Sequence, residues 1–133
     1  MLPAGLFFQT SFMGLLTWLT RNWADTDEPG DPQLAPVELP VPPAETLARV
    51  EAAIVTLPRW RVESVDHGAG VLRATRRTRL WRFIDDVTVR LEPTAAGTRV
   101  HARSQARVGT GDLGQNRRNL LALFQALQQA GNS

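Results

Sequence analysis

Residues 87–108 read Val-Thr-Val-Arg-Leu-Glu-Pro-Thr-Ala-Ala-Gly-Thr-Arg-Val-His-Ala-Arg-Ser-Gln-Ala-Arg-Val, and this stretch decides the fold. Apolar residues occupy every second position from Val87 to Leu91, with polar residues between them. From Arg99 to Val108, small or apolar residues alternate with arginine, histidine and glutamine. A period of two places successive side chains on opposite faces of a strand. Because Pro93 to Gly97 has the composition of a turn, the stretch predicts two strands joined by a short connection.

Three further strands are predicted upstream. Trp60–Asp66 alternates in the same way, and a second run from Val71 to about Trp81 is rich in arginine. The glycines of His67–Gly70 predict a turn between these two strands. Val37–Val41 predicts a short strand, and the flanking prolines place it at a sheet edge or a strand end.

Two amphipathic helices complete the pattern. The first begins near Pro43 and ends before Pro58, with apolar residues spaced three or four positions apart. The second runs from about Asp112 to Gln129, and leucines and one phenylalanine form its apolar face. Each helix therefore has one stripe that must be buried against another element.

The order of elements is strand, helix, four strands, helix. Consecutive strands with short turns predict an antiparallel sheet, whose apolar face the two helices cover. A chain of 133 residues with 43% apolar residues has material for one core. We therefore predict a single α+β domain over residues 37–130. Its element order resembles the helix-grip and TATA-binding-like folds, a comparison that carries no function.

The amino-terminal segment, residues 1–24, is predicted to be an amphipathic helix. Six apolar residues share one face of it: Phe8, Phe12, Leu15, Leu16, Leu19 and Trp23. Such a helix can pack on the domain, lie on a membrane surface or, at this borderline length, span a membrane. We expect a cytoplasmic protein, or one with loose peripheral membrane contact through residues 1–24.

An acidic segment follows at residues 25–36. Its Asp-Thr-Asp-Glu-Pro-Gly-Asp-Pro sequence breaks regular structure. We expect an exposed linker between the helix and the domain.

Composition excludes several kinds of site. The chain has no cysteine and two histidines, so it has no disulfide or thiolate metal site and too few ligands for a histidine-built zinc site.

All 15 basic residues are arginine. Through Asp66 there are four arginines against nine acidic residues, whereas from His67 onward there are eleven against four. This asymmetry indicates either intramolecular pairing or an anionic partner for the second half.

Two polar blocks stand out in that second half. Residues 82–90 read Arg-Phe-Ile-Asp-Asp-Val-Thr-Val-Arg, and residues 103–116 read Arg-Ser-Gln-Ala-Arg-Val-Gly-Thr-Gly-Asp-Leu-Gly-Gln-Asn. They resemble the DUF1499 family, in which a Phe, Asp-Asp, Val and Arg block precedes Arg-Ser-x-Ser-Arg-x-Gly-x-x-Asp-x-Gly-x-Asn. The resemblance covers roughly residues 18–127, with departures at Ala106, where serine is common, and at Asn119, where a basic residue is frequent. It implies a family and a fold, and no activity.

A structural interpretation accounts for both blocks. Asp112 and Gln115 have the spacing of a capping box at the start of the last helix. Asp85 or Asp86 can pair with Arg103 or Arg107 across neighbouring strands, because these side chains lie within cross-strand reach.

A functional interpretation uses the same residues for an anion. Arginines near a helix amino terminus can hold a phosphate or carboxylate of a small molecule or a lipid head group. The hypothetical ligand-binding set is Arg82, Asp85, Asp86, Arg103, Arg107, Asp112 and Asn116. We expect neither a metal nor a cofactor, because adjacent aspartates on a strand point to opposite faces and cannot both join one metal site.

The alternative is a nucleic-acid-binding domain with an arginine-rich sheet face, Arg76 and Arg79 included. It has less support, since the chain has no tyrosine and offers no evident stacking platform. Enzymatic activity has less support still. Ser104 has no histidine on its own strand face, and no phosphate loop or dinucleotide fingerprint is present.

Overall fold

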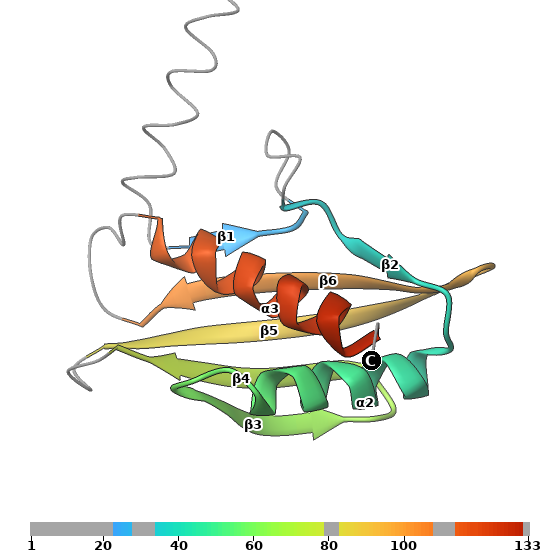
Figure 1. The fold of residues 1–133 in the computed structure, drawn as a ribbon, viewed down its shortest axis with the longest axis horizontal. Helices are drawn as coiled ribbons and strands as arrows, with labels where there is room; N and C mark the ends of the chain where they lie inside the picture. The colour runs from blue at the N-terminus through green and yellow to red at the C-terminus, as the bar shows by residue number, and fades with distance from the viewer. Residues whose placement is uncertain (1–22, 28–33, 79–82, 108–113, 132–133) are drawn as a thin grey trace, which may run out of the picture.

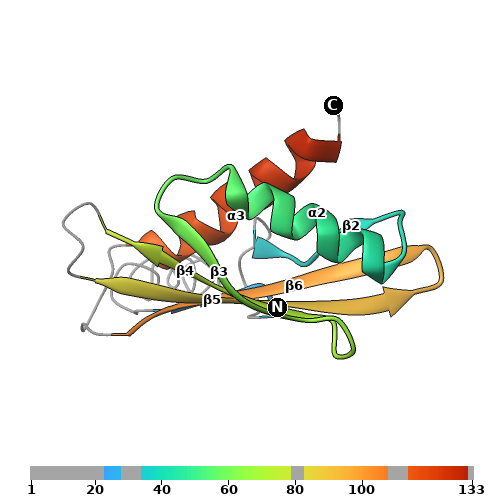
Figure 2. The same ribbon diagram turned by 90° about the horizontal axis from the view of Figure 1, so that it is seen from below.

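The computed structural model describes residues 23–27, 34–78, 83–107 and 114–131. They form an antiparallel six-stranded sheet with two helices on one of its faces (Figures 1 and 2). The elements in chain order are β1 (Trp23–Asp25), β2 (Val37–Leu39), α2 (Pro43–Val55), β3 (Trp60–Asp66), β4 (Val71–Arg77), β5 (Ile84–Thr94), β6 (Gly97–Ala106) and α3 (Gln115–Gly131). The predicted α+β class and the antiparallel sheet are confirmed.

The hairpin of β5 and β6 lies at the centre of the sheet. Its register runs from Asp85 opposite Ala106 to Thr94 opposite Gly97. The strand order is β1-β6-β5-β4-β3, and β2 also pairs with β6. The two short strands β1 and β2 therefore lie end to end along the same edge of β6, as Figure 1 shows.

The core lies between the sheet and the two helices. Side chains from alternate positions of β4, β5 and β6 face the helices and are buried. They pack against the apolar stripes of α2 and α3, and the helical residues of the core are Leu47, Val50, Ala53, Ile54, Leu120, Leu123, Phe124 and Leu127. Alternation in the strands and three-to-four spacing in the helices thus fill one common layer. We call the sheet face opposite α2 and α3 the outer face.

Two predictions about the amino-terminal region are wrong where the structure describes it. Residues 23–25 form strand β1 rather than the end of a helix, and Ala24 is fully buried in the core. The segment 25–36 is not exposed throughout, because Thr26 and Leu34 are buried. Thr26 is fixed by hydrogen bonds of 2.9 Å in both directions with the backbone of Ala102. Pairing with β6 satisfies backbone groups that a helix in this position would satisfy internally.

The remaining amino-terminal predictions concern residues 1–22 and 28–33, which lie outside the described residues. The helix-grip comparison stays a prediction. Within the described ranges, neither helix has the length and apolar character needed to cross a membrane.

Candidate functional site

The sheet divides the predicted ligand-binding residues between its two faces. Asp85 is 5% exposed and lies on the helix-covered face together with the buried Asn116. Asp86, Arg103 and Arg107 lie on the outer face, as strand alternation requires. Arg82 and Asp112 lie outside the described residues, so the capping box of Asp112 stays a prediction.

On the helix-covered face, a buried polar network joins the two sequence blocks. The Ser104 hydroxyl donates to Asn116 Oδ1 at 2.6 Å. Asn119 Nδ2 donates to Asp85 Oδ2 at 2.8 Å and to Ser104 Oγ at 3.2 Å. Gln115 Nε2 donates to Asn119 Oδ1 at 2.8 Å. These bonds satisfy groups that burial would otherwise make costly, and they attach the first turns of α3 to β5 and β6.

Arg76 also belongs to this buried side. Its Nη1 lies 3.8 Å from Asp85 Oδ2, and its side chain is 14% exposed. Burial lowers the pKa of Arg76 below its ordinary value, while the negative charge of Asp85 acts in the opposite direction. Arg76 is therefore engaged beside the core and does not extend from the sheet toward a partner.

On the outer face, most arginines are paired with carboxylates. Arg107 binds both oxygens of Asp86, with Nε to Oδ2 and Nη2 to Oδ1 each at 2.9 Å. This confirms the predicted cross-strand pairing, and the hydrogen bond that Arg107 donates to Asp86 raises the pKa of Arg107. Arg103 donates to Asp25 Oδ2 at 3.1 Å, and its guanidinium carbon lies 4.6 Å from the centre of the Trp23 ring.

The far end of the outer face repeats the pattern. Arg99 lies between Glu38 and Glu92, with hydrogen bonds of 2.9 Å to each. Hydrogen bonding to Glu38 raises the pKa of Arg99. Arg90 donates to Asp27 Oδ2 at 3.0 Å. Exposed pairs of this kind contribute little stability each, but they occupy the guanidinium groups.

Arg73 is the exception. Its direct neighbours across the sheet are Ser64 on β3 and Thr88 on β5. Both neighbours are neutral hydroxyl residues, so neither can neutralise a guanidinium. Among the described residues, the exposed Arg73 side chain makes no hydrogen bond or ion pair. The outer face thus presents a cation whose donors are not used within the described chain.

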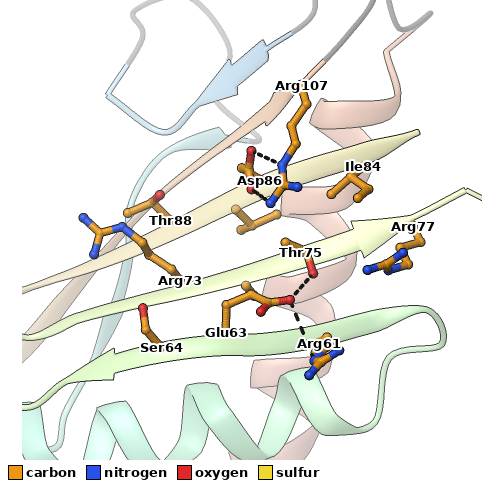
Figure 3. Close-up of a pocket in the computed structure, with 12 residues that line it drawn as sticks. Arg61, Glu63, Ser64, Arg73, Thr75, Arg77, Ile84, Asp86, Thr88 and Arg107 are labelled. Carbon is orange, nitrogen blue, oxygen red and sulfur yellow. Dashed lines mark hydrogen bonds and ion pairs between the residues drawn. The ribbon is translucent and has the colours of Figure 1, made fainter. Parts of the chain in front are cut away.

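Arg73 lines a cavity of about 480 Å³ on the outer face of β3, β4 and β5. Figure 3 shows side chains from these strands and Arg107 around it. Its charged lining residues are four arginines and two acidic residues: Arg61, Arg73, Arg77, Arg107, Glu63 and Asp86. Hydroxyl groups of Ser64, Thr75 and Thr88 also line it. The lining therefore has an excess of positive charge and several neutral donors.

A second hollow of about 330 Å³ adjoins the cavity, and Arg73 and Thr88 line both. It also contains Arg103 and the His101 ring, whose Nδ1 is 2.6 Å from Asp27 Oδ1. Two of the predicted residues, Asp86 and Arg107, therefore lie at the larger cavity, and Arg103 lies at the smaller one. Over the described ranges, no three acidic or histidine side chains are grouped as a metal would require.

Spacing along the chain did not single out Arg73 or its hydroxyl neighbours. Their relation appears only when the register of β3, β4 and β5 is known. The buried role of Asn119 had one sequence signal, since this residue departs from the basic residue frequent in the family pattern.

Acid is expected to lower the stability of the fold by protonating Glu92 on the outer face. The hydrogen bond with His101 lowers the pKa of Glu92 below its ordinary 4.5, and Arg99 adds to the effect. A carboxylate with a lowered folded-state pKa stabilises the fold above its unfolded-state pKa, and this stabilisation is lost as pH falls through the folded-state pKa. The denaturant midpoint of the wild-type protein should therefore fall more steeply below about pH 4.5 than that of Glu92→Gln. Parallel curves for the two proteins would contradict this assignment.

The fold and the outer face together define a small α+β module with a helix-covered core and a polar sheet face. A family model described as "Protein of unknown function (DUF1499)" matches residues 16–127. The chain therefore belongs to the DUF1499 family, as the two polar blocks predicted.

Two solved structures are similar to the chain. Protein MLL2253 from Mesorhizobium loti is similar with a TM-score of 0.50 and 14% sequence identity, over 83% of this chain and 96% of that one. Protein CV1439 from Chromobacterium violaceum has a TM-score of 0.44 and 12% identity, over 82% of this chain and 94% of its own. At this identity the first likeness shows the fold alone. A search of curated proteins finds no match.

Proposed function

We propose that the chain is a binding module for an anionic small molecule or lipid head group, and that the anion binds at Arg73 on the outer face. The observation that carries this proposal is the Arg73 guanidinium, which lines a cavity of about 480 Å³ and is not paired with any residue of the described ranges. The ligand class is the one predicted from sequence. The anchoring arginine is different, because Arg103 and Arg107 already bind Asp25 and Asp86.

The chemistry around Arg73 suits a phosphate or carboxylate. A guanidinium presents two parallel N–H donors to such a group, and the charge strengthens each hydrogen bond. Ser64 and Thr88 flank Arg73 in the sheet register and add hydroxyl donors on either side. An anion entering here displaces no internal carboxylate, whereas at Arg107 it would compete with both oxygens of Asp86.

The nucleic-acid alternative has a weaker basis. Tracking a phosphate backbone requires a row of accessible cations. On the described outer face, Arg90, Arg99, Arg103 and Arg107 are each bound to a carboxylate. Arg76 lies on the helix-covered side, and Arg79 lies outside the described residues.

The test is titration of the protein with inorganic phosphate and with ethyl phosphate, followed by calorimetry or by NMR shifts. Arg73→Gln should weaken binding about tenfold or more, because a hydrogen bond to a charged group contributes roughly 1.5–3 kcal/mol. Arg49→Gln is the matched control, since Arg49 is an arginine of α2 whose side chain binds only Glu45 among the described residues. We expect Arg49→Gln to bind as the wild type does.

Two results would overturn the proposal. One is equal affinity in the wild-type and Arg73→Gln proteins. The other is the absence of binding by the wild type to either phosphate while heparin retains it in a salt-sensitive manner, which would favour the nucleic-acid alternative.

A further inference from the structure

We infer that the ligand is a zwitterion, an aminoalkyl phosphate whose phosphate binds Arg73 and whose ammonium group binds Glu63. This inference rests on the proposed function and adds to it the second half of the ligand. The observation behind it is a carboxylate in the cavity that is only partly used by the protein.

Glu63 is directed into the cavity by an irregularity in β3. The register of β3 and β4 shifts between Val62 and Ser64, so Glu63 is the extra residue of a β-bulge. In a regular strand Glu63 and Ser64 would face opposite sides of the sheet. Because of the bulge both are exposed and both line the cavity. Bulges commonly re-aim a side chain in this way, often beside functional sites.

The Glu63 carboxylate retains capacity for a cation. Its Oε1 accepts a hydrogen bond of 2.8 Å from the Thr75 hydroxyl. The nearest guanidinium, that of Arg61, is 3.8 Å away, and its side chain is 72% exposed. Among the described residues, Oε2 of Glu63 has no hydrogen bond. A long contact with an exposed arginine is weak, so an ammonium group can replace it at little cost.

The other acidic residue of the cavity cannot serve in the same way. Both oxygens of Asp86 are bound by the Arg107 fork at 2.9 Å. Among the described residues that line the cavity, Glu63 is therefore the acidic residue with an unused oxygen, and Arg73 lines the same cavity. Figure 3 shows the Glu63 carboxylate directed toward Thr75 and the Arg73 guanidinium beside Thr88.

The charges explain why a zwitterion fits better than a simple anion. Arg73 and Glu63 line the same cavity of about 480 Å³, and charges within a Debye length of about 8 Å are not fully screened. An anion in this cavity is therefore repelled by the Glu63 carboxylate. A ligand with an ammonium group a few bonds from its phosphate turns this repulsion into attraction. A phosphate monoester offers three free oxygens and a phosphodiester two, and the guanidinium of Arg73 and the flanking hydroxyls of Ser64 and Thr88 can donate to them.

The experiment compares O-phosphoethanolamine with ethyl phosphate, which has the same phosphate and no amine. We expect the wild-type protein to bind O-phosphoethanolamine about tenfold more tightly, a ratio typical of one added charged contact. Glu63→Gln should remove this preference by weakening O-phosphoethanolamine and not ethyl phosphate. Gln retains an oxygen for Thr75, so the variant should unfold at the wild-type denaturant midpoint. Arg73→Gln should weaken the binding of both ligands about tenfold or more.

The outcomes separate this inference from the proposed function. Equal binding of both compounds by the wild type, or a preference that persists in Glu63→Gln, would overturn the zwitterion and leave the anion site standing. Binding of neither compound would overturn both.

Vesicles of phosphatidylcholine with and without phosphatidylethanolamine identify the source of the aminoalkyl phosphate. If the protein binds the phosphatidylethanolamine vesicles and O-phosphoethanolamine releases it from them, the ligand is a lipid head group. If the protein binds O-phosphoethanolamine but not the vesicles, the ligand is a free metabolite.

Discussion

Gly97→Ala should lower the free energy of unfolding by about 3 kcal/mol or more, because a side chain at this position meets both strain and a clash. Gly97 begins β6 with φ of 155°, a conformation that residues with a Cβ rarely adopt. A Cβ there would lie 2.8 Å from Val41 N and 2.9 Å from Pro40 Cα, and it would also collide with the Leu39 carbonyl oxygen. These are backbone atoms of the connection between β2 and α2, so they cannot rotate away. Urea denaturation at neutral pH measures the effect.

Gly68→Ala is the matched control. Gly68 also lies in a hairpin turn, but its φ is not in the strained range and a Cβ there would meet only Asp66 Oδ1 at an ordinary 3.6 Å. We expect a change within about 0.5 kcal/mol, as for a surface substitution without a clash. Equal stability of the two variants would contradict the close approach of the β5–β6 turn to the β2–α2 connection.

Asn119→Ala is expected to cost about 2–4 kcal/mol, because it removes a donor from a buried carboxylate and leaves other polar groups without partners. Asn119 is 2% exposed and binds Asp85, Ser104 and Gln115 at once. The truncation also leaves a small cavity at the start of α3. Amide protection in the first turns of α3 should fall more than in its last turns, since the hydrogen bonds of Asn119 hold that end of the helix to the sheet. Denaturant unfolding and hydrogen exchange measure the two effects.

Gln125→Ala serves as its control on the same helix. Gln125 is exposed, so its truncation should change stability by less than about 0.5 kcal/mol. Equal losses of stability in the two variants would mean that the polar network does not hold α3 to the sheet.

Much of the fold could be predicted because local patterns coincide with tertiary burial. Alternation in residues 99–108 identified β6, and Pro43 and Pro58 bracketed α2. Strand β1 was not predicted. Three residues are too few to show a period, and a tryptophan and an alanine fit a helix equally well. Its strand conformation follows from pairing with β6, whose edge it covers.

The candidate site was predicted less well because residues close in sequence can lie on opposite faces of a sheet. The pairing of Asp86 with Arg107 was anticipated from cross-strand reach and is confirmed. The hypothetical ligand-binding set, however, combined Arg103 with Asn116, and the sheet lies between these two side chains. Asn116 is bound to Ser104, the residue next to Arg103, on the helix-covered side.

The sequence by itself determined the α+β class, the antiparallel hairpin, the two covering helices and the DUF1499 membership, since each depends on periodicity or on motif spacing. Only the tertiary structure decided that Arg73, on the outer face of the sheet, makes no hydrogen bond or ion pair among the described residues. A guanidinium is neutralised by whatever lies opposite it on the next strand, and that neighbour depends on register and on the bulge in β3. Arg73 faces Ser64 and Thr88, whereas Arg99 faces Glu38 and Glu92, and their own sequence neighbourhoods do not distinguish the two.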